Sequence, residues 1–151
     1  MSACTFIAAD VPLPTAAPSR EYPLEINIDT GTIFDGGADD NFYLQEFLDA
    51  ADYTHKTYAV WLDWNPTPGR AERILQYIRD ILQTAEEVEL WHVWQPGYHE
   101  FEDRPVIRRR AFSIGELTGE DILALDDAEI WDHPDKRYPE RPQFTCVIVQ
   151  R

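Results

Sequence analysis

The chain has 151 residues, of which 44% are hydrophobic, so it has the size and composition of one globular domain and is too apolar for a disordered protein. Its formal net charge is −15, from 28 acidic and 13 basic side chains. This charge opposes binding to nucleic-acid phosphates, which depends on Lys and Arg. It fits solubility, attraction of a basic partner or substrate, and affinity for divalent cations, and charge alone does not rank these three.

No apolar stretch of about 18 residues occurs, so the sequence predicts no transmembrane helix. The first nine residues lack the basic region and the long apolar run of a signal peptide. The two cysteines, Cys4 and Cys146, lie in apolar runs near opposite ends and make no disulfide framework. These features predict a cytoplasmic protein with reduced thiols and no membrane partner.

The N-terminal part of the chain predicts short strands and irregular segments. Residues 3–8 are apolar, with β-branched and aromatic members, and predict a strand. Residues 11–23 contain four prolines, so we expect an extended arm on the surface. The turn-forming residues 29–32 lie between short strand-like stretches and indicate a hairpin. Residues 42–47 fit a strand and a helix equally well, and that assignment stays open.

A strand, a helix and a second strand form the organising unit of the chain. Residues 58–64 and 88–94 both have strand character and share a Trp-x-x-Trp spacing. The second strand is too apolar on both faces for a solvated edge, so we expect it to be central. Between the strands, Thr67 is a predicted N-cap and Pro68 the first helical residue. The apolar side chains of this helix recur with helical spacing at Ala71, Ile74, Leu75, Ile78 and Leu82.

The C-terminal part predicts two more strands and a short helix. Residues 106–114 contain three consecutive arginines, which indicates a strand with at least one solvated face. A capping box at 118–121 begins a helix that we expect to end near Leu125. Residues 132–142 are rich in proline and charge and predict a long loop, whereas the apolar run 144–149 predicts a buried strand.

The predicted fold class is α+β, with a mixed β-sheet, one long helix and one short helix in a single domain over residues 1–151. From residue 58 on, the order of elements is that of a ferredoxin-like βαββαβ core, to which residues 1–57 add strands and a proline-rich arm. A right-handed crossover places the strands 58–64 and 88–94 parallel in one sheet, with the helix on one face. The arm, a second subunit or a ligand could cover the other face.

Two groups of residues could bind a metal ion. In the first, Asp35, Asp39 and Asp40 lie in a glycine-rich loop that could bring carboxylates together around a hard cation. Their spacing does not match the helix-loop-helix calcium pattern, and the alternative is a solvated turn. In the second, His92 and His99 precede a short acidic stretch that could complete a zinc site. The alternative for His92, which lies among apolar neighbours, is a hydrogen-bonded core residue.

A third group combines aromatic and basic side chains in an otherwise acidic chain. A binding site for a small ligand or peptide could use Trp61, Trp91, His92, Trp94, Arg108 and Arg110. Guanidinium groups stack on indole rings and pair with carboxylates or phosphates. The alternative is that the tryptophans pack in the core while the arginines pair across the sheet with Asp63, Glu89 or Glu100.

The sequence contains no nucleophile elbow, no phosphate-binding glycine loop and no paired-cysteine ribbon, so we expect no cofactor and lean against an enzyme. The leading hypothesis is a non-catalytic interaction or accessory protein that binds a basic partner protein. A small-ligand binder or hydrolase with a pocket lined by Trp, Arg and His is the alternative. The oligomeric state is left open.

Overall fold

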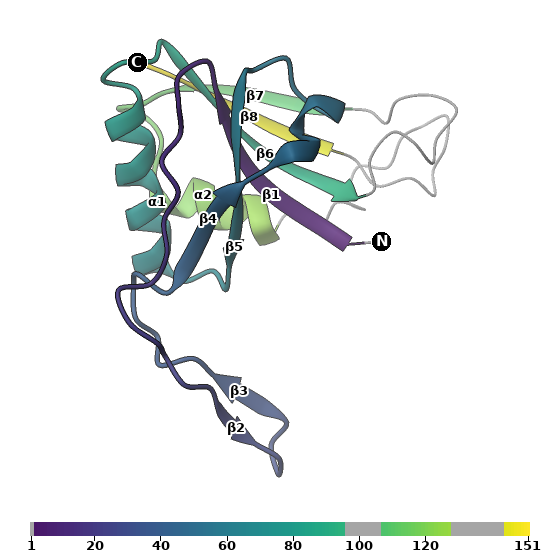
Figure 1. The fold of residues 1–151 in the computed structure, drawn as a ribbon, viewed down its shortest axis with the longest axis vertical. Coiled ribbons are helices and arrows are strands. Elements are labelled where there is room, and N and C mark those ends of the chain that lie inside the picture. Colours follow the sequence, from purple (N-terminus) through teal and green to yellow (C-terminus); the bar gives the residue numbers. More distant parts are fainter. Residues whose placement is uncertain (1, 96–106, 128–143) are drawn as a thin grey trace.

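The computed structural model describes residues 2–95, 107–127 and 144–151, so the predicted loop at 132–142 lies outside the described residues. A mixed six-stranded sheet has the strand order β4-β5-β1-β6-β8-β7 (Figure 1). Its strands are β1 (Ser2–Ala9), β4 (Phe42–Glu46), β5 (Tyr58–Trp64), β6 (Glu87–Gln95), β7 (Ile107–Ser113) and β8 (Phe144–Gln150). The α+β class is therefore confirmed, and residues 42–46 form a strand.

The centre of the sheet is made by β1 and β6, and β6 contains the predicted central strand. β1 lies between β5 and β6 and is antiparallel to both, so β5 and β6 run in the same direction without touching as neighbours. In a ferredoxin-like core, β7 would take the place between β5 and β6. The ferredoxin-like core is not confirmed, because β1 takes that place and β7 lies at the edge, parallel to β8.

Two helices, α1 (Pro68–Ile81) and α2 (Gly119–Asp127), pack on one face of the sheet. The predicted caps are confirmed: the Thr67 hydroxyl accepts a hydrogen bond from the Arg70 backbone N–H at 3.2 Å. At α2, the Thr118 hydroxyl accepts from the Asp121 N–H, and the Asp121 carboxylate accepts from the Thr118 N–H. Among the described residues, neither helix is long and apolar enough to cross a membrane.

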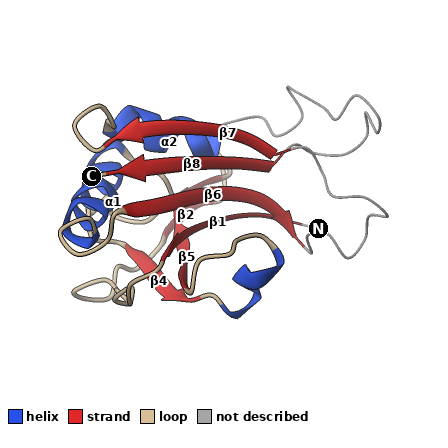
Figure 2. Cartoon of the chain, turned by 90° about the horizontal axis from the view of Figure 1, so that it is seen from above, coloured by secondary structure: helices blue, strands red, loops and turns tan. Residues whose placement is uncertain are grey.

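Side chains alternate along each strand and build two separate cores. On the helix side, the buried strand residues include Ile7, Val60, Leu90 and Val149. On the opposite side, the buried residues of the sheet are Cys4, Phe6, Ala8, Trp91, Val93, Phe144 and Cys146. This second face is partly covered by the short 3-10 helix η1 (Leu48–Asp52) and the residues beside it (Figure 2).

The proline-rich segment 11–23 contains no regular strand, as predicted, and part of it runs between β4 and α1 (Figure 1). One isolated bridge joins Ala16 to Leu44 of β4, and the Tyr77 hydroxyl of α1 donates a hydrogen bond to the Pro14 carbonyl at 2.7 Å. The predicted hairpin follows as β2 (Glu25–Asn27) and β3 (Thr32–Phe34), which form a separate two-stranded sheet that projects from the body (Figure 1). Gly31, with φ at 67°, supplies the left-handed residue of its turn.

Candidate functional site

The predicted group of aromatic and basic side chains is divided between the two faces of the sheet. The register aligns His92 with Arg108 across the sheet, and the side chains of both residues, like that of Arg110, face the helix side. Trp91 and Arg109 lie in the next row and face the opposite side. The structure therefore does not bring Trp91 together with Arg108 or Arg110, and the arginine beside Trp91 is Arg109.

The members of this group have different surroundings. His92 is buried, and its Nδ1 lies 2.8 Å from the Thr5 hydroxyl. Trp61 is exposed on β5, and the side chain of Trp94 lies outside the described part of the structure. Arg108 and Arg110 are exposed. In the described residues neither arginine forms an ion pair with Asp63 or Glu89, and the third partner considered, Glu100, lies outside the described residues.

The acidic loop at 35–40 is tied to the body of the protein through Arg70. The Arg70 side chain is fully buried and donates two hydrogen bonds to the Asp35 carboxylate, at 2.9 and 3.0 Å. It also donates to the carbonyls of Ala38 and Asn65. The hydrogen bond from Arg70 and a second one from the Gly37 N–H lower the pKa of Asp35 to about 2.

The other two loop carboxylates also have partners within the chain. Asp39 lies against Gly69 in the first turn of α1, where a Cβ atom would collide with its carboxylate. Asp40 accepts hydrogen bonds from Ser19 and from the Tyr22 hydroxyl, and these hold its pKa well below the usual range. No three metal-ligating side chains converge in the described residues. The predicted metal site at this loop stays a prediction, and the one at His92 and His99 extends outside the described residues.

The projecting hairpin, defined here as residues 24–34, carries an unusual amount of exposed apolar surface. Five large apolar side chains on it are between 54% and 90% exposed. They are Leu24, Ile26, Ile28, Ile33 and Phe34. The segment 20–40, which contains the hairpin and its two connections to the body, has six acidic residues and one basic residue, Arg20. The hairpin thus combines an apolar surface with an acidic surround.

A cavity of about 310 Å³ lies on the sheet face opposite the helices, beside the residues that follow η1. Its lining includes Thr54, Glu89, Trp91 and Arg109. The Glu89 carboxylate is 8% exposed and accepts hydrogen bonds from the Thr54 hydroxyl at 2.7 Å and from Trp91 Nε1 at 3.1 Å. The Cys146 thiol also donates to it, at 3.8 Å. Burial, assisted by the charge of Glu89, raises the pKa of Cys146 to about 12, so this thiol is not a nucleophile near neutral pH.

Trp91 forms the buried floor beside Glu89. Its ring is stacked on Phe6 with centroids 5.8 Å apart, and the Arg109 guanidinium lies 5.5 Å from the ring centroid. Tyr53 packs against the same Phe6 ring at 5.7 Å. The ring stack fixes the orientation of the indole N–H, and therefore holds the Glu89 carboxylate in one position.

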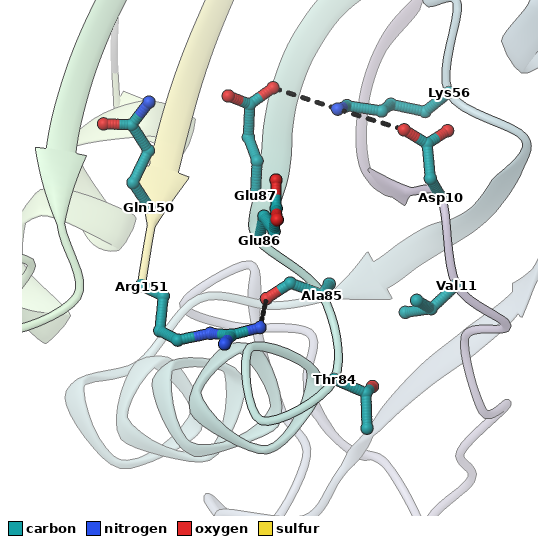
Figure 3. Close-up of a pocket in the computed structure, with 9 residues that line it drawn as sticks. All are labelled: Asp10, Val11, Lys56, Thr84, Ala85, Glu86, Glu87, Gln150 and Arg151. Carbon is teal, nitrogen blue, oxygen red and sulfur yellow. Dashed lines mark hydrogen bonds and ion pairs between the residues drawn. The ribbon is translucent and has the colours of Figure 1, made fainter.

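A neighbouring cavity of about 460 Å³ shares the rim residues Asp10, Lys56 and Glu87 with the first (Figure 3). The Lys56 ammonium lies 2.9 Å from Glu87 and 3.4 Å from Asp10. Burial alone would lower the pKa of Lys56, but Glu87 and Asp10 together outweigh it and raise the pKa. In the same cavity, Arg151 donates to the Ala85 carbonyl. Lys56 thus pairs with two carboxylates of this cavity, whereas Arg151 is held by a backbone carbonyl.

Sequence reasoning missed several residues that build these features. Thr54 and Tyr53 gave no signal, because their segment has no periodicity that predicts contact with the sheet. Glu89 was predicted only as a partner for an arginine, and Arg70 only as a polar residue of the helix. The exposure of Ile26 and Ile33 could not be read from their strand-like pattern, which is equally typical of buried strands.

The chain matches no known protein family, and no curated protein or solved structure shows significant similarity to it. An account of its function therefore starts from the projecting hairpin and the Glu89 cavity.

Proposed function

We propose that the protein is a non-catalytic interaction protein that docks its projecting hairpin onto a basic partner protein. The observation that carries this proposal is the group of five exposed apolar side chains on the hairpin. A contiguous exposed apolar patch is typical of protein interaction sites. A lone two-stranded hairpin is also only marginally stable in water, so burying this surface against a partner would stabilise it.

The attachment of the hairpin to the body supports the same proposal. On one side, Asp35 is held by the buried Arg70 of α1. On the other side, the Ser19 backbone N–H and the Tyr22 hydroxyl bind Asp40. The second connection is therefore fixed to the body and the first is fixed to the second, whereas the tip carries its apolar side chains into solvent. A fixed presentation lowers the ordering cost of docking.

The negative charge of the protein favours a partner with a basic surface. The net charge of −15 and the acids around the hairpin favour an apolar groove with basic residues on its rim. A second copy of this chain would bring the same acids, Glu25 and Asp29, into contact with each other. Opposite charges would speed the encounter, and apolar side chains such as Ile26 and Ile33, which are paired on one face of the hairpin, would anchor the complex. We expect this encounter in the cytoplasm, where the two buried free thiols would stay reduced.

The test compares proteins retained from a cell lysate by the immobilised wild-type protein and by two variants. Ile26→Ser/Ile33→Ser removes apolar surface from the hairpin, and Leu48→Ser is the control, because Leu48 is 81% exposed but lies on η1. We expect basic proteins that are retained by the wild type and by Leu48→Ser, lost with the hairpin variant, and released by salt. Equal retention by both variants, or retention that salt does not weaken, would contradict the proposal.

A further inference from the structure

Glu89 is a buried carboxylate that faces a cavity without an ionic partner. Its neighbours Thr54, Trp91 and Cys146 all donate hydrogen bonds to it, which suits the ionised carboxylate. Among the residues that the structure describes, no Lys, Arg or His forms an ion pair with it. Buried carboxylates are rare unless they are paired with a positive charge. Glu89 therefore lacks the cation that a buried carboxylate normally has.

The lysine and the arginine that line the cavity are engaged elsewhere. Lys56 lies between Asp10 and Glu87, so two carboxylates already balance its charge. Arg109 lies over the Trp91 ring, and its side chain is exposed to solvent. An exposed guanidinium is satisfied by water, whereas the buried Glu89 has hydrogen-bond donors but no ion-pair partner among the described residues. The missing partner of Glu89 is thus positive.

We propose that the cavity binds a small organic cation, with a primary ammonium group placed against Glu89. The volume of about 310 Å³ is at the lower end of the range for small-molecule sites, which suits an alkylamine rather than a larger ligand. An anion would meet the carboxylates of Glu87 and Glu89. A bare metal ion would find no third converging ligand in the described residues. This inference is independent of the hairpin and its partner.

The indole N–H of Trp91 provides a direct probe, because it donates to the carboxylate that would receive the ligand. We would titrate ¹⁵N-labelled protein with butylammonium chloride and follow the five tryptophan side-chain N–H signals by NMR, with Trp91 assigned from a Trp91→Phe variant. The proposal expects a saturable shift of the Trp91 signal. Butan-1-ol, which has the same alkyl chain without the charge, should give no saturable shift at the same concentrations.

Two variants with the same change in charge separate Glu89 from the general acidity of the surface. Glu89→Gln should weaken butylammonium binding by at least about tenfold, because it removes the charged acceptor. Glu86→Gln is the matched control, since Glu86 is exposed and lines only the neighbouring cavity, and its affinity should stay within about twofold of the wild type. No saturable shift in the wild type, an equal effect of butan-1-ol, or equal losses in the two variants would each overturn the proposal.

Discussion

Arg70 connects the helix to the loop that carries the projecting hairpin, and it does so from a fully buried position. We predict that Arg70→Ala lowers the free energy of unfolding by about 3 kcal/mol, because it leaves Asp35 without its partner and two carbonyls without their donor. Urea denaturation measures this change. Arg73→Ala, at an exposed position of the same helix, should cost less than about 0.5 kcal/mol. Equal losses for the two variants would show that the buried contacts of Arg70 contribute little.

The pairing of Asp35 with Arg70 also predicts a dependence of stability on pH. The pKa of Asp35 is about 2 in the folded protein, below its ordinary value of 3.8. A carboxyl group whose pKa is lowered by folding stabilises the folded state at pH values above its ordinary pKa. This contribution is lost as the pH falls towards the pKa of the folded state. We therefore expect stability to decrease between about pH 4 and pH 2. The stability of the Asp35→Asn variant should decrease less over this interval. A variant with the same acid dependence as the wild type would contradict the assignment of this dependence to Asp35.

The residues of the candidate sites were predictable only in part. Alternation along β6 puts Trp91 and His92 on opposite faces, and this alternation follows from one strand alone. Which arginine of β7 lies beside Trp91 depends on the register of three strands, and a shift of one residue exchanges Arg109 for Arg108. No local pattern contains that register.

At the scale of elements, local signals identified α1, α2 and the projecting hairpin, since each depends on residues a few positions apart. The Thr67 cap of α1 is one such signal. We predict that Thr67→Ala destabilises the protein by about 1 kcal/mol, because the Arg70 N–H loses its acceptor. Thermal or urea unfolding measures the effect, with the exposed Thr15→Ala as control. A Thr67→Ala protein as stable as the control would show that the cap is dispensable.

The strand order could not be predicted from the elements alone. The sequence from residue 58 on contains the expected alternation of strands and helices, and the helix α1 does connect two strands of the same direction. The position between those strands, however, is taken by β1, which is far away in the sequence. Its apolar pattern predicted a strand, but the identity of the neighbours of β1 depends on long-range pairing.

For the whole molecule, the net negative charge opposes self-association, whereas the exposed apolar hairpin favours it. At neutral pH the charge of −15 keeps copies apart, but near the isoelectric point of about 4.4 this repulsion disappears. We predict that sedimentation velocity shows monomers at pH 7 and self-association near pH 4.4. Ile26→Ser/Ile33→Ser should associate less than Leu48→Ser. Equal association of the two variants would mean that the hairpin does not mediate self-association.

The central place of β1 has a consequence for how the chain folds. Thr5 of β1 contacts His92 of β6, which is 87 positions away in the chain, and the other neighbour of β1 is β5. A nascent chain must therefore emerge beyond residue 95 before β1 can have both of its neighbours. Contacts so distant in sequence are formed slowly. Until they form, the apolar strand containing Phe6 and Ile7 is exposed to aggregation, and we expect the closing of the sheet around β1 to be the slow step of folding.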